Sequence, residues 1–171
     1  MDVSKLIELR ACQEALRWAE GQTDDASAWA TCERGDWMLW LLGRIAGPPW
    51  SDSRKPLVLA ACECARLALP YTKNPRVLAC IETAEAWTRE GATIEQVQIA
   101  RNAAYAAYAD DAAAAAAAAA YAYAADAADA AADAAYAAYA AADAAAYKKR
   151  NDVLRSCADI VRKHYPTAPQ L

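Results

Sequence analysis

The stretch that decides the fold class is Ala103 to Tyr147, which reads AAYAAYADDAAAAAAAAAYAYAADAADAAADAAYAAYAAADAAAY. It contains neither glycine nor proline. Alanine has the highest helix propensity, because it loses no side-chain entropy in a helix. As one straight helix the tract would extend about 68 Å at ~1.5 Å per residue, roughly twice the diameter of a small domain. We therefore expect several helices, with a turn near Asp110 and Asp111.

The larger side chains of this tract are spaced so that they share one helix face. Asp126, Asp129, Asp133 and Tyr136 follow one another at three- and four-residue steps. The other faces are nearly pure alanine, which allows helices to approach closely. The three carboxylates could hold a hard cation such as magnesium. A solvated face explains them more simply, since no matching Glu/His motif is present, and we predict no metal site.

The rest of the chain also has helical patterns, which glycine and proline separate. The expected helices cover approximately 4–20, 26–33, 37–47, 56–69, 75–90, 94 onward and 149–164. Gly21 is expected to end the first in a left-handed conformation, and Asp36, Asn74 and Thr93 are expected to cap later ones. The sequence thus predicts an all-α fold, a compact multi-helix bundle with an Ala-rich C-terminal helical layer.

Length and composition narrow the class of protein further. The 171 residues fit one helical domain, with mixed-composition helices in 1–101, Ala-rich helices in 102–147 and a terminal helix and tail in 148–171. A net charge of -4 argues against a partner that is a nucleic acid polymer. The beginning of the chain lacks the apolar run of a signal peptide, and the aspartates disfavour insertion of the alanine tract into a membrane. We expect a cytoplasmic protein without a membrane partner, whose alanine faces favour a homo-oligomer.

Catalytic signals are absent from the sequence. The single histidine, His164, has no flanking motif and is expected on the surface at a helix end. There is no phosphate-binding loop, dinucleotide fingerprint or zinc-protease motif. The six cysteines lie in apolar helical patterns, so we expect free, buried thiols, including Cys12 on the inward stripe of the first helix. We predict a protein that is not an enzyme and has no cofactor.

The most distinctive stretch is Cys32 to Trp40, CERGDWMLW. Tryptophan faces and arginine forks suit stacking on a nucleobase and gripping a phosphate, and a helix start favours anions. Tryptophans three residues apart are also typical core anchors, and we favour the core for Trp37 and Trp40. The candidate ligand-binding residues are Arg34, Asp36, Trp37, Trp40, Arg44 and Trp50.

Four motifs and the alanine tract carry a family resemblance. In order, they are Ala11-Cys12 with Trp18, Cys32 to Trp40, Cys64-Ala65-Arg66, and Cys80-Ile81-Glu82 with Trp87. With these motifs the chain resembles an immunity protein family of bacteria and phages, the one similar to the fifth immunity-protein group. The resemblance spans most of the chain.

The resemblance implies a role in conflict between bacteria and phages. It implies a non-enzymatic binding protein that sequesters and neutralises a toxin, effector or defence component. A second interpretation stays open: a phage counter-defence sponge that binds a nucleotide immune signal, either a cyclic oligonucleotide or an ADP-ribose derivative, in a pocket lined by tryptophan and arginine.

Overall fold

The computed structural model describes residues 3–48, 51–71, 74–105, 140 and 149–171. Within these ranges every regular element is a helix, and the helices pack into a compact bundle, as predicted. The predicted Ala-rich layer at 102–147 lies almost entirely outside the described residues, as do the expected turn at Asp110 and the aspartate face at 126–133.

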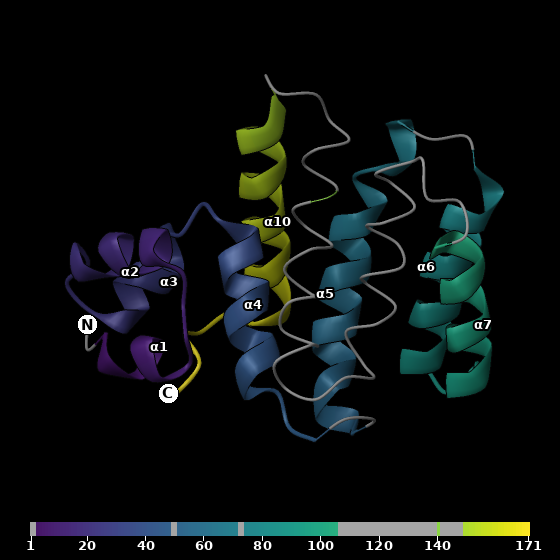
Figure 1. Ribbon diagram of the computed structural model, residues 1–171, viewed down its shortest axis with the longest axis horizontal. Coiled ribbons are helices and arrows are strands. Elements are labelled where there is room, and N and C mark those ends of the chain that lie inside the picture. Colours follow the sequence, from purple (N-terminus) through teal and green to yellow (C-terminus); the bar gives the residue numbers. More distant parts are fainter. Residues whose placement is uncertain (1–2, 49–50, 72–73, 106–139, 141–148) are drawn as a thin grey trace.

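The helices form successive layers. Figure 1 shows α1, α2 and α3 grouped at one end, followed by α4 with α10, then α5, and finally α6 with α7; both chain termini lie beside the first group. Two short 3-10 turns, Asp52–Arg54 and Leu69–Tyr71, flank α5. The α-helical bounds are α1 Ser4–Glu8, α2 Gln13–Glu20, α3 Asp25–Thr31, α4 Gly35–Ile45, α5 Lys55–Arg66, α6 Pro75–Thr88, α7 Ile94–Tyr105 and α10 Arg150–His164.

Two of the predicted caps are confirmed. The Asn74 side chain accepts a hydrogen bond from the Arg76 backbone N–H at 3.1 Å and opens α6. Thr93 Oγ1 accepts from the Gln96 N–H at 3.2 Å, while Gln96 Oε1 accepts from the Thr93 N–H at 2.8 Å. This reciprocal pair is a capping box, which satisfies two backbone donors at the start of α7.

The single helix predicted over 4–20 is wrong, because the chain breaks between α1 and α2. Arg10 has a φ of 64°, the left-handed conformation that glycine usually supplies. The Ala11 N–H bonds Leu6 O and the Arg10 N–H bonds Ile7 O, both at 2.9 Å, which is the pattern of a Schellman helix end. Gly21, the expected left-handed residue, instead has a φ of -80°.

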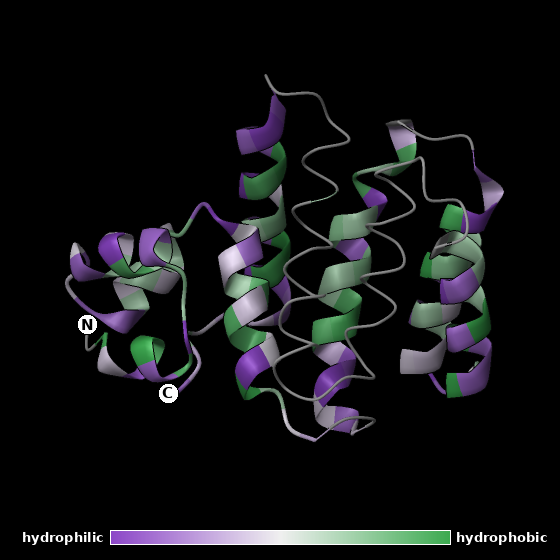
Figure 2. Ribbon diagram, viewed as in Figure 1, coloured by the Kyte–Doolittle hydropathy of each residue, from purple (hydrophilic) through white to green (hydrophobic). Residues whose placement is uncertain are grey.

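The core is centred on α5, which lies between the other layers. Most of α5 is hydrophobic, whereas α1–α3 mix hydrophobic and hydrophilic residues (Figure 2). On one side of this core α4 approaches α10 closely, since a Cβ added to Gly35 would lie 2.6 Å from the Ala158 backbone nitrogen. Glycine at position 35 therefore allows the two helix backbones to meet.

The terminal helix is confirmed, with Leu154, Cys157 and Val161 buried as predicted. All six cysteines are free, and five are buried. Cys12 is exposed instead, because it precedes α2 in an extended conformation and does not lie within a helix. No helix among the described residues has the length and apolar character that crossing a membrane requires.

Candidate apolar binding pocket

A pocket of about 90 Å³ lies where the α1–α3 group, helix α4 and the end of the chain meet. Its described walls are almost entirely apolar, and Asp25 is the single charged residue among them. Leu6, Met38 and Leu41 contribute aliphatic side chains, and the last residues of the chain contribute Ala168, Pro169 and Leu171. Four tryptophans also line it: Trp18, Trp29, Trp37 and Trp40.

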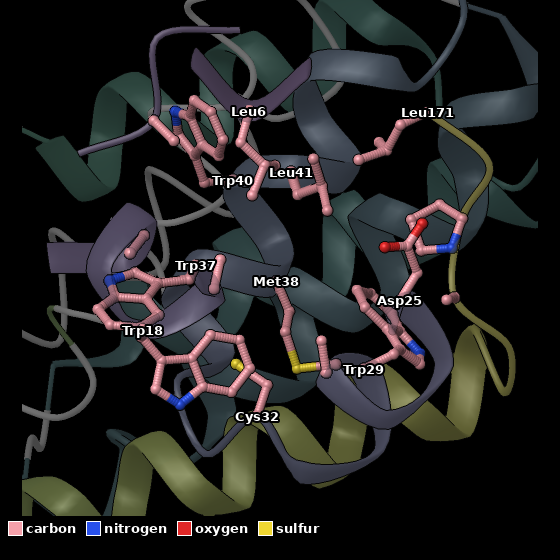
Figure 3. A pocket seen from close by; sticks show the side chains of 16 residues that line it. Leu6, Trp18, Asp25, Trp29, Cys32, Trp37, Met38, Trp40, Leu41 and Leu171 are labelled. Carbon is pink, nitrogen blue, oxygen red and sulfur yellow. The ribbon is translucent and has the colours of Figure 1, made fainter. Parts of the chain in front are cut away.

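Local helix geometry places two of these tryptophans. Trp37 and Trp40 are one helical turn apart on α4, so they share the face that looks toward α1 and α2. The rings of Trp18 and Trp37 lie 6.0 Å apart at an interplanar angle of 58°, a favourable tilted aromatic pair. Figure 3 shows this pair on one side of the pocket and Trp29, with Asp25 and Leu171, on the other.

Trp29 connects the pocket to the last part of the chain. Its indole Nε1 donates a hydrogen bond to the backbone carbonyl of Tyr165 at 2.8 Å. Arg162 Nη1 donates to the carbonyls of Trp29 and Cys32, at 3.2 and 2.8 Å, and so satisfies acceptors that the end of α3 leaves open. Burial raises the pKa of Tyr165 to about 12, so its phenol stays uncharged at neutral pH.

Arg34 and Asp36 form a closed ion pair beside the pocket. Arg34 Nε donates to Asp36 Oδ1 at 2.8 Å, and Nη2 donates to Oδ2 at 2.6 Å. The guanidinium carbon lies 4.2 Å from the centre of the Trp37 ring, and Glu14 lies 3.5 Å from Nη1. The hydrogen bonds to Asp36 raise the pKa of Arg34 despite partial burial. The cationic head is therefore already neutralised within the protein.

The cap predicted at Asp36 is wrong. Arg34 occupies the N-cap position, and Asp36 lies in the first turn of α4 with only 6% of its surface exposed. Its carboxylate accepts both hydrogen bonds from Arg34 and none from a backbone N–H of the helix start. A strong charge-assisted pair replaces the weaker capping bond.

The structure brings together only part of the predicted site. Trp37 and Trp40 line the pocket and are half-buried, so the core role favoured for them is not fully realised. Arg34 and Asp36 lie beside the wall as a structural pair. Arg44 is not among the lining residues, and its Nε is buried without a hydrogen-bond partner among the described residues. Trp50 lies outside the described residues.

Trp29 and the end of the chain belong to the site although the sequence pattern does not predict them there. Trp18 also lines the pocket, whereas the sequence indicates it only as part of a motif. The available signal was the apolar and proline content of the last residues, which follow a complete amphipathic helix. The packing of residue 165 against residue 29 depends on tertiary structure, which no local pattern encodes.

His164 differs from the expected surface histidine. Its side chain is 16% exposed, and its Nε2 lies 2.9 Å from Glu63 Oε1 on α5. Lys163 donates to both oxygens of the same carboxylate, at 3.1 and 3.0 Å. Partial burial raises the pKa of Glu63, but the hydrogen bonds from Lys163 and His164 prevail and hold the pKa below its usual value. This cluster joins α5 to α10.

The described residues contain no group of three or more His, Cys, Asp or Glu side chains that could hold a metal ion. Comparisons of this chain with protein-family models, with curated proteins and with solved structures find no match. The proposed function therefore depends on the geometry of the pocket.

Proposed function

We propose that this chain is a non-enzymatic, cytoplasmic binding protein of bacterial or phage conflict systems that sequesters a protein toxin, effector or defence component. It would grip an apolar segment of that partner in the tryptophan pocket. The observation that carries the proposal is a partly open, almost entirely apolar cavity walled by four tryptophans. Large aromatic side chains of this kind dominate the energetics of protein interfaces.

With Ala168, Pro169 and Leu171 in its wall, the pocket has a size that favours a single side chain as its occupant. Its volume of about 90 Å³ is smaller than the cavity of roughly 150 Å³ that accepts benzene in an engineered protein. Pockets for drug-sized ligands measure about 300–1,000 Å³. An aliphatic or proline side chain presented by a protein is therefore a better match than a whole nucleotide.

The charges beside the pocket support the same choice. A nucleotide signal would need cations for its phosphates, but Arg34 is already paired with Asp36. Asp25, the charged residue among the described lining residues, would repel an anion. The sponge for a nucleotide signal remains the alternative, with less support from these contacts.

The test fills the pocket without removing any of its packing. Ala15 lies on α2 and lines the pocket, so Ala15→Leu adds a branched side chain to the cavity. Ala30→Leu is the matched control, because Ala30 is exposed on α3 and does not line the pocket. Both variants and the wild type serve as baits for affinity capture from bacterial lysate, after circular dichroism has confirmed their helical content.

We expect a partner that the wild type and Ala30→Leu retain and that Ala15→Leu loses by at least about tenfold in affinity, the equivalent of ~1.4 kcal/mol. The purified partner should form a complex of fixed stoichiometry and lose its own activity in it. Equal retention by Ala15→Leu would refute the role of the pocket. A thermal shift of several degrees with a cyclic oligonucleotide or an ADP-ribose derivative would support the alternative instead.

A further inference from the structure

The last residues of the chain form a strap across the tryptophan pocket. We define the strap as residues 166–171, with the sequence Pro-Thr-Ala-Pro-Gln-Leu. Pro169 and Leu171 line the pocket together with Ala168, while Gln170 between them is exposed and does not. The strap thus occupies part of the space that a binding partner would use.

The strap has the chemistry of a proline-rich ligand. Pro169 and Leu171 both line the pocket and have a Pro-x-Leu spacing, whereas Pro166 is exposed and does not line it. Proline fixes its own φ and pushes the preceding residue toward an extended conformation, so such a segment loses little entropy when it is held. Segments of this type dock in grooves lined by aromatic residues. The tryptophan walls of this pocket provide such a surface.

The hydrogen bond at the start of the strap fits the same mode of recognition. An extended, proline-containing segment has no internal hydrogen bonds, so its carbonyls are available to donors. Trp29 Nε1 donates to the carbonyl of Tyr165, directly before Pro166, at 2.8 Å. A tryptophan in the wall thus binds the backbone, while side chains beyond it line the pocket.

Beyond that anchor the strap is held by apolar contact alone. Residues 166–171 make no hydrogen bond or ion pair with the described part of the chain. Leu171 is 41% exposed although it lines the pocket. A segment held in this way can be displaced by a competitor that makes the same contacts more completely.

We infer that the tryptophan pocket is a recognition site for Pro-x-Leu segments, that the strap is its intramolecular ligand, and that a partner binds by presenting a segment of the same class and displacing the strap. This inference rests on the proposed function, for which it names the partner chemistry and a mode of regulation.

The test releases the strap within the 171-residue chain and adds the same segment as a separate peptide. Pro169→Asp and Leu171→Asp each place a charge against the apolar wall and should release the strap. Gln170→Asp is the matched control, because it adds the same charge at the exposed position between them. The probe is a synthetic peptide with the sequence of residues 165–171, titrated while tryptophan fluorescence is recorded.

We expect the peptide to bind both release variants at least about tenfold more tightly than it binds the wild type or Gln170→Asp, because a tethered ligand competes at a local concentration of about millimolar. A second peptide, with alanine in place of both prolines, should bind the release variants at least about tenfold more weakly than the first, since it lacks the preset extended conformation. Adding Ala15→Leu to a release variant should abolish binding of the first peptide.

Equal peptide affinity for the wild type and the release variants would overturn the role of the strap, and equal affinity for the two peptides would overturn the Pro-x-Leu class. If an aspartate variant does not fold, Leu171→Ala replaces it, with an expected gain of about threefold from the loss of part of one half-buried side chain. These outcomes are independent of partner capture. Capture that Ala15→Leu does not impair would overturn the proposed function even if the strap behaves as inferred.

Discussion

The central helix α5 and the tryptophan pocket differ in how completely their apolar side chains are buried. Helix α5 is mostly enclosed, and Leu57, Val58, Ala61 and Cys64 are among its residues with no exposed surface at all. The α1–α3 group instead has a small cluster of its own, which consists of Leu6, Leu16 and Ala19. Tryptophans of this group and of α4 line a partly open cavity.

This difference separates a region that stabilises the bundle from the region in which we propose that a partner binds. A mostly buried helix contributes to the global free energy of unfolding, whereas regions with fewer buried contacts open at lower cost and often bind ligands. The pocket lies in the second kind of region, and the strap covers it with a few apolar contacts. The comparison predicts that mutations in the two regions differ in size and in kind.

The largest expected effect is that of Leu57→Ala in α5, compared with Leu6→Ala in the pocket. Truncation of a fully enclosed leucine leaves a closed cavity and should lower the free energy of unfolding by about 3–5 kcal/mol. Leu6 is 7% exposed and borders a cavity that is already open. Leu6→Ala should therefore lower the free energy of unfolding by only about 2 kcal/mol. Urea unfolding measures both values. Losses of equal size would show that the pocket region is packed as firmly as the core.

The next effect concerns Arg34, which lies at the border between the two regions. Arg34→Gln removes the partner of Asp36, whose side chain is only 8% exposed. An unpaired buried carboxylate is costly, and because Arg34 itself is partly exposed we expect a loss of about 2 kcal/mol on urea unfolding. The double variant Arg34→Gln with Asp36→Asn should recover most of it. If Arg34→Gln leaves the free energy of unfolding unchanged, the ion pair is not needed for stability, and the ligand-binding role predicted for Arg34 would gain support.

The starts of α6 and α7 were predictable because their signals are local. Asn74 before Pro75 and Thr93 three residues before Gln96 each satisfy backbone donors within a single turn. The end of α1 was not predictable in the same way, because a non-glycine residue, Arg10, adopts the left-handed conformation there. The strap and its anchor on Trp29 join residues 136 positions apart, and no periodicity reports such a contact.

The ion pair of Arg34 with Asp36 was not predictable, because side chains two residues apart do not face each other on a helix. In the structure Arg34 precedes the helix, with φ -106° and ψ 84°, and this non-helical backbone lets its side chain reach Asp36. Two of the four tryptophans in the wall, Trp37 and Trp40, could be predicted as neighbours, since a one-turn spacing on a helix is a local property.

The smallest effect is expected at Glu63, where α5 meets α10 outside the enclosed core. Because hydrogen bonds from Lys163 and His164 hold the pKa of Glu63 below its ordinary value of 4.5, the ionised carboxylate stabilises the fold above that value. This contribution is lost as the pH falls through the lowered pKa. Glu63→Gln should therefore lower the free energy of unfolding by about 1 kcal/mol or less at pH 7, since the group is partly exposed, and this deficit should shrink toward pH 3.

Glu95→Gln, at an exposed position on α7, is the matched control in urea unfolding at pH 7 and pH 3. A deficit of Glu63→Gln that stays constant with pH would mean that packing, and not charge, joins the two helices at this edge.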